Sequence, residues 1–289
     1  MSDAQLDMAL AYLKTQPDAA AAVMERLPAA QVAEFLLNIP YRQASQILAR
    51  MLPVHAARLC DHLSAQDAAS LMSGMKTFRV AAVVRHMHRD NAVAVQGFLP
   101  ERVRLAIRVM LGYSESVVGA WMLTDYPLAT DDEQAEATLK RLASLGAGAE
   151  LGTVFVVDRN GTLVGVVSLL KLLQSPGQAS VSALMRASPE SVSANASLGS
   201  LARSPIWRRY QSVAVVNSRR QLIGVLRHQD LREGLALQSR PSLSTSEGGA
   251  INTLWQAYGG SLAAMVDLVS DLSAPVQAPM KVTDKGGSR

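Results

Sequence analysis

The sequence has few cysteines, aromatic residues and charged residues, on which several classes of protein depend. Cys60 is the single cysteine among 289 residues, so the chain can form neither an internal disulfide nor a cysteine cluster around a metal. Aromatic residues make up 4% of the chain and charged residues 18%, and no dense run of lysine and arginine occurs. The net charge of +4 is therefore spread thinly, and we expect no nucleic-acid partner.

Targeting and catalytic signals are also missing. The start, MSDAQLDMAL, has no basic segment before an apolar run, so we expect a cytoplasmic protein. No phosphate-binding glycine loop or nucleophile motif occurs, and Ser114 and Ser116 flank Glu115 with no histidine beside them. The five histidines lack the spacing of zinc ligands. We therefore predict that the chain is not an enzyme.

The first third of the chain repeats a short helical pattern about every dozen residues. Leu27-Pro28, Ile39-Pro40, Leu52-Pro53 and Leu99-Pro100 mark the breaks, since proline ends one helix and suits the start of the next. Units this short cannot bury an apolar face alone, but stacked units can. Residues 1–112 are therefore predicted to form a superhelix of short helices, with an ordinary helical bundle as the alternative.

After this helical region, the predicted elements are a strand, a turn, a second strand and a helix, and this order occurs twice. The first copy is GTVFVVDRNGTLVGVVSLLKLL, from residue 152, with an Asn-Gly turn. The second contains SVAVV, the turn NSRRQ, LIGVL and a helix from residue 227. A helical pattern precedes each hairpin, including residues 131–144. We predict two modules, 113–174 and 175–238, joined in one pseudo-symmetric α/β domain.

Residues 239–289 are predicted to hold a linker, an amphipathic helix and a flexible tail. The helix is marked by uncharged residues with helical spacing on one face, and the alternative of a membrane-spanning helix is less favoured because polar residues interrupt it. We expect this interaction helix to pack on its own domain, a second subunit or a membrane protein. Its central residues are Trp255, Tyr258, Leu262 and Val266.

The repeated unit h-x-V-V-[DN]-x-x-x-x-L-[VI]-G-V-[VL] resembles a pair of CBS modules. The order of short-helix repeats, YSESVVGAWM and this pair resembles the cytosolic N-domain and CBS pair of the MgtE-type magnesium transporter family, over residues 20–237. In the link, Tyr113, Glu115, Gly119 and Met122 fit the family pattern, whereas Ser116 replaces a second acid. The resemblance implies an α + α/β fold. Family members continue into membrane helices, and we expect this chain to be the regulatory half without them.

The resemblance also implies where an adenine nucleotide would bind. Family members that bind one carry a hydroxyl after the glycine strand, for phosphate, and an acid three residues on, for the ribose. The first copy has Ser168 but Lys171 at the acid position, and the second has Asp230 but Arg227 at the hydroxyl position. Each copy keeps half of the pair. Either the chain binds no nucleotide, or Asp230 holds the ribose and Arg227, Arg208 or Arg209 meets the phosphates.

A magnesium site is the second ligand that the resemblance implies. In the family, acids of the helical domain face acids of the CBS domain, and Mg²⁺ screens their repulsion. This chain is poor in such pairs, so ordinary helix starts and turns are the alternative interpretation for its acids. The candidates are Asp67, Asp90 and Glu101 on the helical side and Asp131, Asp132, Glu133, Glu136 and Asp158 on the CBS side.

Three functional hypotheses follow. The leading one is a regulatory or sensor module that dimerises through its CBS pair, binds a protein partner such as a membrane transporter, and senses Mg²⁺. The second is an adenine-nucleotide-sensing CBS protein. The third is an interaction scaffold that binds no small ligand. Under the first, the cytoplasmic chain would associate with a membrane through its partner.

Overall fold

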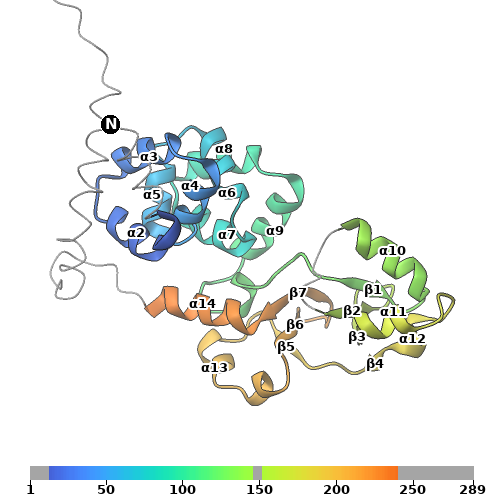
Figure 1. Cartoon of the computed structure of the whole chain (residues 1–289). Helices are drawn as coiled ribbons and strands as arrows, with labels where there is room; N and C mark the ends of the chain where they lie inside the picture. Colours follow the sequence, from blue (N-terminus) through green and yellow to red (C-terminus); the bar gives the residue numbers. More distant parts are fainter. Residues whose placement is uncertain (1–12, 146–151, 240–289) are drawn as a thin grey trace, which may run out of the picture.

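The computed structural model describes residues 13–145 and 152–239, which form a helical domain followed by two small sheets (Figure 1). The fold is the predicted one: a superhelix of short helices and then a tandem β-β-α pair. The predicted C-terminal helix, with Trp255, Tyr258, Leu262 and Val266, lies outside the described residues.

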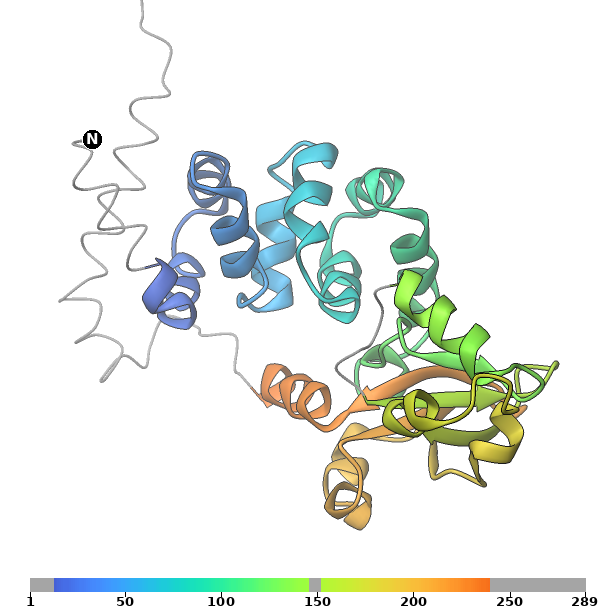
Figure 2. The same cartoon turned by 45° about the vertical axis from the view of Figure 1, so that its right-hand side comes forward.

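The helical domain is a two-layered stack in which each helix packs on the one two places along the chain. Thus α3 packs on α5, α5 on α7 and α7 on α9, while α4 packs on α6 and α6 on α8 (Figures 1 and 2). This alternation is that of a superhelix rather than of a bundle with long helices. The helices are α2 (Pro17–Met24), α3 (Ala29–Leu37), α4 (Tyr41–Leu48), α5 (Pro53–Cys60), α6 (Ala65–Ser73), α7 (Thr77–His86), α8 (Arg89–Phe98) and α9 (Glu101–Leu111).

The prolines begin helices as the repeat pattern predicts. Pro28, Pro40 and Pro100 each directly precede a helix, and Pro53 is the first residue of α5. Small alanines and a few large side chains fill the space between the layers, and the buried Cys60 is part of this core. The interior of the stack is apolar apart from the buried Ser45 of α4.

Each module of the second domain contributes one sheet. The first sheet has the order β1-β2-β3-β4 and the second the order β5-β6-β7, with a parallel first pair and an antiparallel hairpin in both. The strands are β1 (Leu128–Thr130), β2 (Thr153–Val157), β3 (Leu163–Ser168), β4 (Arg186–Ala187), β5 (Ser191–Ser193), β6 (Ser212–Val216) and β7 (Leu222–Arg227). The helices are η1 (Val118–Ala120), α10 (Ala135–Leu145), α11 (Leu169–Gln174), α12 (Val181–Leu184), α13 (Leu198–Ala202), η3 (Pro205–Arg208) and α14 (His228–Ser239).

The two hairpins are pseudo-symmetric in detail. Both have a register irregularity at the same place, between Val156 and Val157 and between Val215 and Val216. Phe155, Ala214 and their apolar neighbours form a core between the two sheets. The cleft between the modules lies beside this core, where β3 passes into α11.

One helix begins later than predicted. The pattern over 131–144 predicts a helix from Asp131, but α10 begins at Ala135. The backbone N–H of Asp131 bonds the carbonyl of Val157, and that of Glu133 bonds the carbonyl of Thr130. Sheet pairing and a turn thus hold this segment out of the helix, and its acids lie in the turn before α10.

The link between the domains packs on the second module rather than the first. The backbone N–H groups of Val118 and Gly119 bond carbonyls of Ala196 and Ala194, and Leu123 pairs with Val225 of β7. The described chain then crosses to β1, beside β2. The helical domain is consequently attached directly to the module that carries α14, which lies beneath it in Figures 1 and 2.

Candidate functional site

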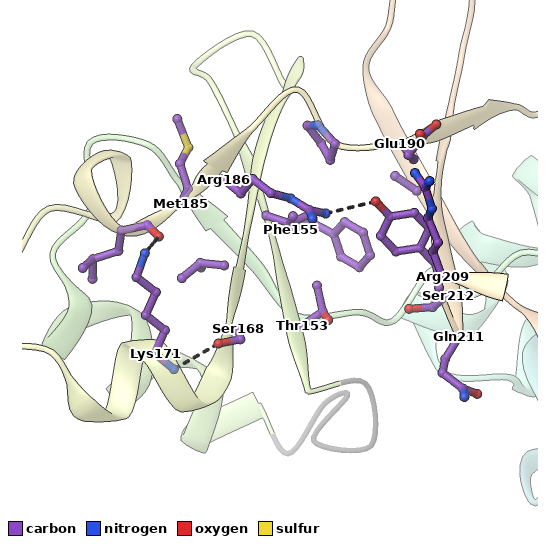
Figure 3. A pocket seen from close by; sticks show the side chains of 16 residues that line it. Thr153, Phe155, Ser168, Lys171, Met185, Arg186, Glu190, Arg209, Gln211 and Ser212 are labelled. Carbon is purple, nitrogen blue, oxygen red and sulfur yellow. Dashed lines mark hydrogen bonds between the residues drawn. The ribbon is translucent and has the colours of Figure 1, made fainter. Parts of the chain in front are cut away.

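A cleft of about 650 Å³ opens between the two modules, where β3 passes into α11 (Figure 3). Its volume is in the range of small-molecule sites in proteins. Its apolar lining includes Phe155, Val166, Val167, Met185 and Ala214. Its charged and hydroxyl-bearing lining residues include Ser168, Lys171, Arg186, Glu190, Arg209 and Tyr210.

The predicted pair Ser168 and Lys171 lies on one side of this cleft. The Ser168 hydroxyl accepts the backbone N–H of Lys171 at 3.1 Å and so caps the start of α11. The Lys171 ammonium donates to the Leu184 carbonyl at 2.6 Å, which leaves two of its three N–H groups to serve a ligand. Both residues reach the cleft from the end of β3, where the sequence places them.

Two arginines lie across the cleft from Lys171. Arg186 on β4 donates to the Tyr210 hydroxyl at 3.4 Å, and its guanidinium carbon is 5.7 Å from the centre of that ring (Figure 3). Arg209 follows η3 in the second module and lines the same space. Three cationic side chains and one carboxylate, Glu190, therefore line the cleft, which favours an anionic ligand.

The other predicted nucleotide residues, Arg227 and Asp230, lie elsewhere. Asp230 is completely buried, and its carboxylate accepts from the Arg227 guanidinium at 2.6 Å and from the Lys76 ammonium at 3.0 Å. The structure thus does not bring the four residues into one site. Asp230 faces the helical domain and is bonded to Arg227, one of the three arginines proposed for the phosphates, whereas Arg209 lines the cleft instead.

Sequence reasoning overlooked Arg186. Strand β4 is only two residues long, and the sequence around it, SALMRASPE, carries no strand pattern. Its position comes from pairing with Val166 of β3 across the module. The pseudo-symmetry of the two modules could have located this segment. Met185, the residue before Arg186, packs on Gly165 as Met122 packs on the equivalent Gly224.

The predicted metal ligands on the helical side are separate helix-start residues. Asp67 and the Ser64 hydroxyl bond each other at the start of α6, with Oγ to Oδ2 at 2.6 Å. Asp90 and Glu101 are exposed in the first turns of α8 and α9, where acids favour the helix dipole. Among the described residues, Asp67 bonds only within the start of its own helix, so these acids do not form a shared site with the acids of the CBS side.

Most of the predicted ligands on the CBS side form ion pairs within their own module. Asp132 pairs with Arg159 at 3.2 Å, Glu133 with Arg141 at 2.9 Å and Glu136 with Lys140 at 2.6 Å. Asp131 lies with Asp132 and Glu133 in the turn before α10, and Glu136 is in the first turn of that helix. Within the parts of the chain that the structure describes, no three histidine, cysteine, aspartate or glutamate side chains gather as ligands of one metal ion would.

The protonation of these acids reflects the same local bonds. The Thr162 backbone N–H, followed by that of Asn160, lowers the pKa of Asp158 below its ordinary value. Hydrogen bonds from Thr130 and then Arg159 lower the pKa of Asp132, and the bond from Lys140 lowers that of Glu136. The three carboxylates are therefore charged at neutral pH, and their partners belong to their own module.

Comparison with known proteins defines the class. Residues 15–116 match the family model of the MgtE intracellular N domain, and residues 118–176 and 181–237 each match the CBS domain. The chain belongs to the family whose members join an MgtE intracellular N domain to a CBS pair. No helix within residues 13–145 and 152–239 has the length and apolar character needed to cross a membrane.

The chain is also similar to individual proteins. The magnesium transporter MgtE of Thermus thermophilus is 23% identical over 237 residues, which are 77% of this chain and 52% of that protein. The chain thus spans about half the length of this curated relative. The crystal structure of the soluble part of a magnesium transporter has a TM-score of 0.57 and 16% identity, and the match covers 83% of this chain and 100% of that one. A structure of the cytosolic domain of the Mg²⁺ channel MgtE with ATP has a TM-score of 0.47 and 18% identity, covering 79% and 99%.

Proposed function

We propose that the chain is a regulatory module in which the CBS pair binds a phosphorylated adenine nucleotide and the helical domain conveys the response to a partner. The cleft between the modules is the observation that carries this proposal. Its apolar lining could contact the adenine base, and the cations of Lys171, Arg186 and Arg209 could bind phosphate oxygens. The proposal assigns no reaction to the chain.

Magnesium enters the proposal through the family. The Thermus relative is named a magnesium transporter, and we propose that this chain acts on the cytoplasmic side of a membrane with a transporter of that kind as its partner. The acids predicted for Mg²⁺, from Asp67 to Asp158, are separate or locally paired. Mg²⁺ is therefore expected to bind this chain more weakly than the nucleotide does.

The proposal includes a homodimer formed through the CBS pair. Leu170 and Leu173 lie three residues apart on α11, so they share one helix face, and each is 62% exposed. An apolar helix face of this kind gains stability when a second copy covers it. We propose that α11 packs against the second subunit.

Thermal unfolding with added ligands tests the proposal. AMP, ADP or ATP at about 100 times the dissociation constant should stabilise the chain by about 2.7 kcal/mol and raise its melting temperature. Arg209→Ala should remove about half of this shift or more, whereas Lys140→Ala, which changes an exposed lysine on α10, should keep it. Stabilisation by Mg²⁺ alone would favour the metal sensor, and no shift with either ligand would favour a scaffold.

A further inference from the structure

Four charged residues join the helical domain to the second CBS module. Lys76 precedes α7 and Arg79 lies three residues later, while Asp230 and Glu233 are three residues apart on α14. Spacing by three places each pair on one face of its helix. The Lys76 Nζ lies 3.0 Å from Asp230 Oδ1 and 2.8 Å from Glu233 Oε2, and Arg79 Nε lies 2.5 Å from Glu233 Oε1.

Burial makes this network different from a surface ion pair. The Asp230 side chain has no exposed area, and the side chains of Arg79, Arg227 and Glu233 are 13%, 15% and 25% exposed. A carboxylate without water depends on nearby cations, and removing one partner leaves a costly buried charge. Two of the cations that serve it, Lys76 and Arg227, come from different domains.

An aromatic contact lies beside the charges. Phe78 of α7 and Trp121 of the link are 5.7 Å apart between ring centres, at an angle of 51°. Gly234 of α14 packs on the same indole, since a Cβ there would lie 2.8 Å from the Trp121 ring. The helical domain, the link and α14 therefore meet at one point, with an apolar contact and an ionic one.

We infer that Lys76, Arg79, Arg227, Asp230 and Glu233 form a lock, the α7–α14 lock, which holds the helical domain on the second CBS module without a bridging metal ion. The charges across the contact are already opposite in sign, so no divalent cation is needed to bring the two surfaces together. The lock also commits Asp230 to the domain contact, which removes the carboxylate that a ligand of the second module would need. The inference does not depend on the nucleotide proposed for the open cleft.

The distance between the domains tests the lock directly. Spin labels are placed on cysteines introduced at exposed Gln66 and Ser182, and labelled chain is diluted with unlabelled chain so that distances within one chain dominate. Buried Cys60 should not react, because burial and the Asp61 charge raise the pKa of its thiol to about 12. The lock predicts one narrow distance that is the same with Mg²⁺ and with EDTA.

Charge reversal supplies the matched variants. Arg79→Glu places two carboxylates face to face and should shift the ratio of closed to open chains by on the order of 30-fold or more. Arg79→Glu with Glu233→Arg should restore the narrow distance, and Lys140→Glu on exposed α10 should leave it unchanged. Helical circular dichroism confirms that each variant is folded.

Three results would overturn the lock. The first is a wild-type distance that becomes narrow only when Mg²⁺ is added. The second is a folded Arg79→Glu variant with the wild-type distance. The third is a folded double variant that stays as open as Arg79→Glu, because the contact would then depend on something other than charge.

Discussion

A glycine in each return strand is required by one methionine side chain. A Cβ on Gly165 would lie 2.4 Å from the Met185 sulfur, and one on Gly224 would lie 2.5 Å from that of Met122. In each copy a methionine side chain fills the space beside the glycine. The two methionines occupy equivalent places, which explains why L-[VI]-G-V-[VL] occurs in both copies.

Gly224→Ala should destabilise the chain by about 1–3 kcal/mol, because the added methyl group overlaps Met122 down to its Cβ, at 2.9 Å. Gly97→Ala in α8 is the control, since a Cβ there meets nothing within 4 Å. That change should stabilise by about 0.5–1 kcal/mol, because alanine suits a helix better than glycine. Urea unfolding measures both. Equal effects at the two positions would show that the contact with Met122 does not matter.

At the scale of elements, α11 and α14 follow equivalent strands but have different roles. The polar part after the strand is SLLK in the first copy and RHQD in the second. Lys171 of α11 faces an open cleft, whereas Asp230 of α14 faces α7. The difference between the copies thus divides the modules into one that offers a cleft and one that carries the helical domain.

The fold could be predicted from local patterns, but the site could be predicted only in part. Proline breaks, the doubled hairpin and its following helix are all local signals, and they specify the superhelix and the β-β-α pair. The role of Asp230 depends on Lys76, which is 154 residues away in the sequence. Arg186 reaches the cleft through a two-residue strand without a pattern of its own. Such long-range partners leave no mark in a local motif.

The lock gives Glu233 a predictable dependence on pH. Burial raises the pKa of Glu233, but the bonds and charges of Lys76 and Arg79 outweigh it, and the net pKa lies below the ordinary 4.5. A carboxyl whose pKa is lower in the folded state stabilises the fold fully above its unfolded pKa. This stabilisation decreases below about pH 4.5 and is lost once the pH falls through the folded pKa.

Glu233→Gln measures that contribution. The free energy of unfolding of wild type minus that of the variant should be positive and constant at neutral pH, and should shrink as the pH is lowered from 5 to 3. Denaturant unfolding at a series of pH values checks it. The same comparison for Lys140→Gln should show only a small effect, because that surface pair is exposed. A wild-type advantage that grows toward acid would contradict the assignment.

At the scale of the whole molecule, large apolar side chains are exposed on both domains of the described surface. On the helical domain, Leu37 at the end of α3 is 50% exposed, and Leu105 and Val109 of α9 are 50% and 47% exposed. On the CBS domain, Leu170 and Leu173 share one face of α11 and are more exposed than these three, at 62% each. We therefore propose α11 for the contact between two chains.

Leu170→Lys with Leu173→Lys should convert a dimer into a monomer, because two charges would have to be buried in the interface. Leu37→Lys is the matched control and should leave the mass unchanged. Sedimentation at several concentrations reports the mass. A double variant that remains dimeric, or a monomeric wild type, would contradict the assignment of α11.

Isothermal titration of the full chain with AMP and ATP tests whether the cleft binds an adenine nucleotide. We predict one binding site per chain, in the cleft between the modules, because Asp230 of the second module is committed to Lys76 and Arg227. Arg209→Ala should weaken that binding about 10-fold or more, since a charge-assisted hydrogen bond is lost. Two equal sites per chain, or no heat from any adenine nucleotide at millimolar concentration, would contradict it.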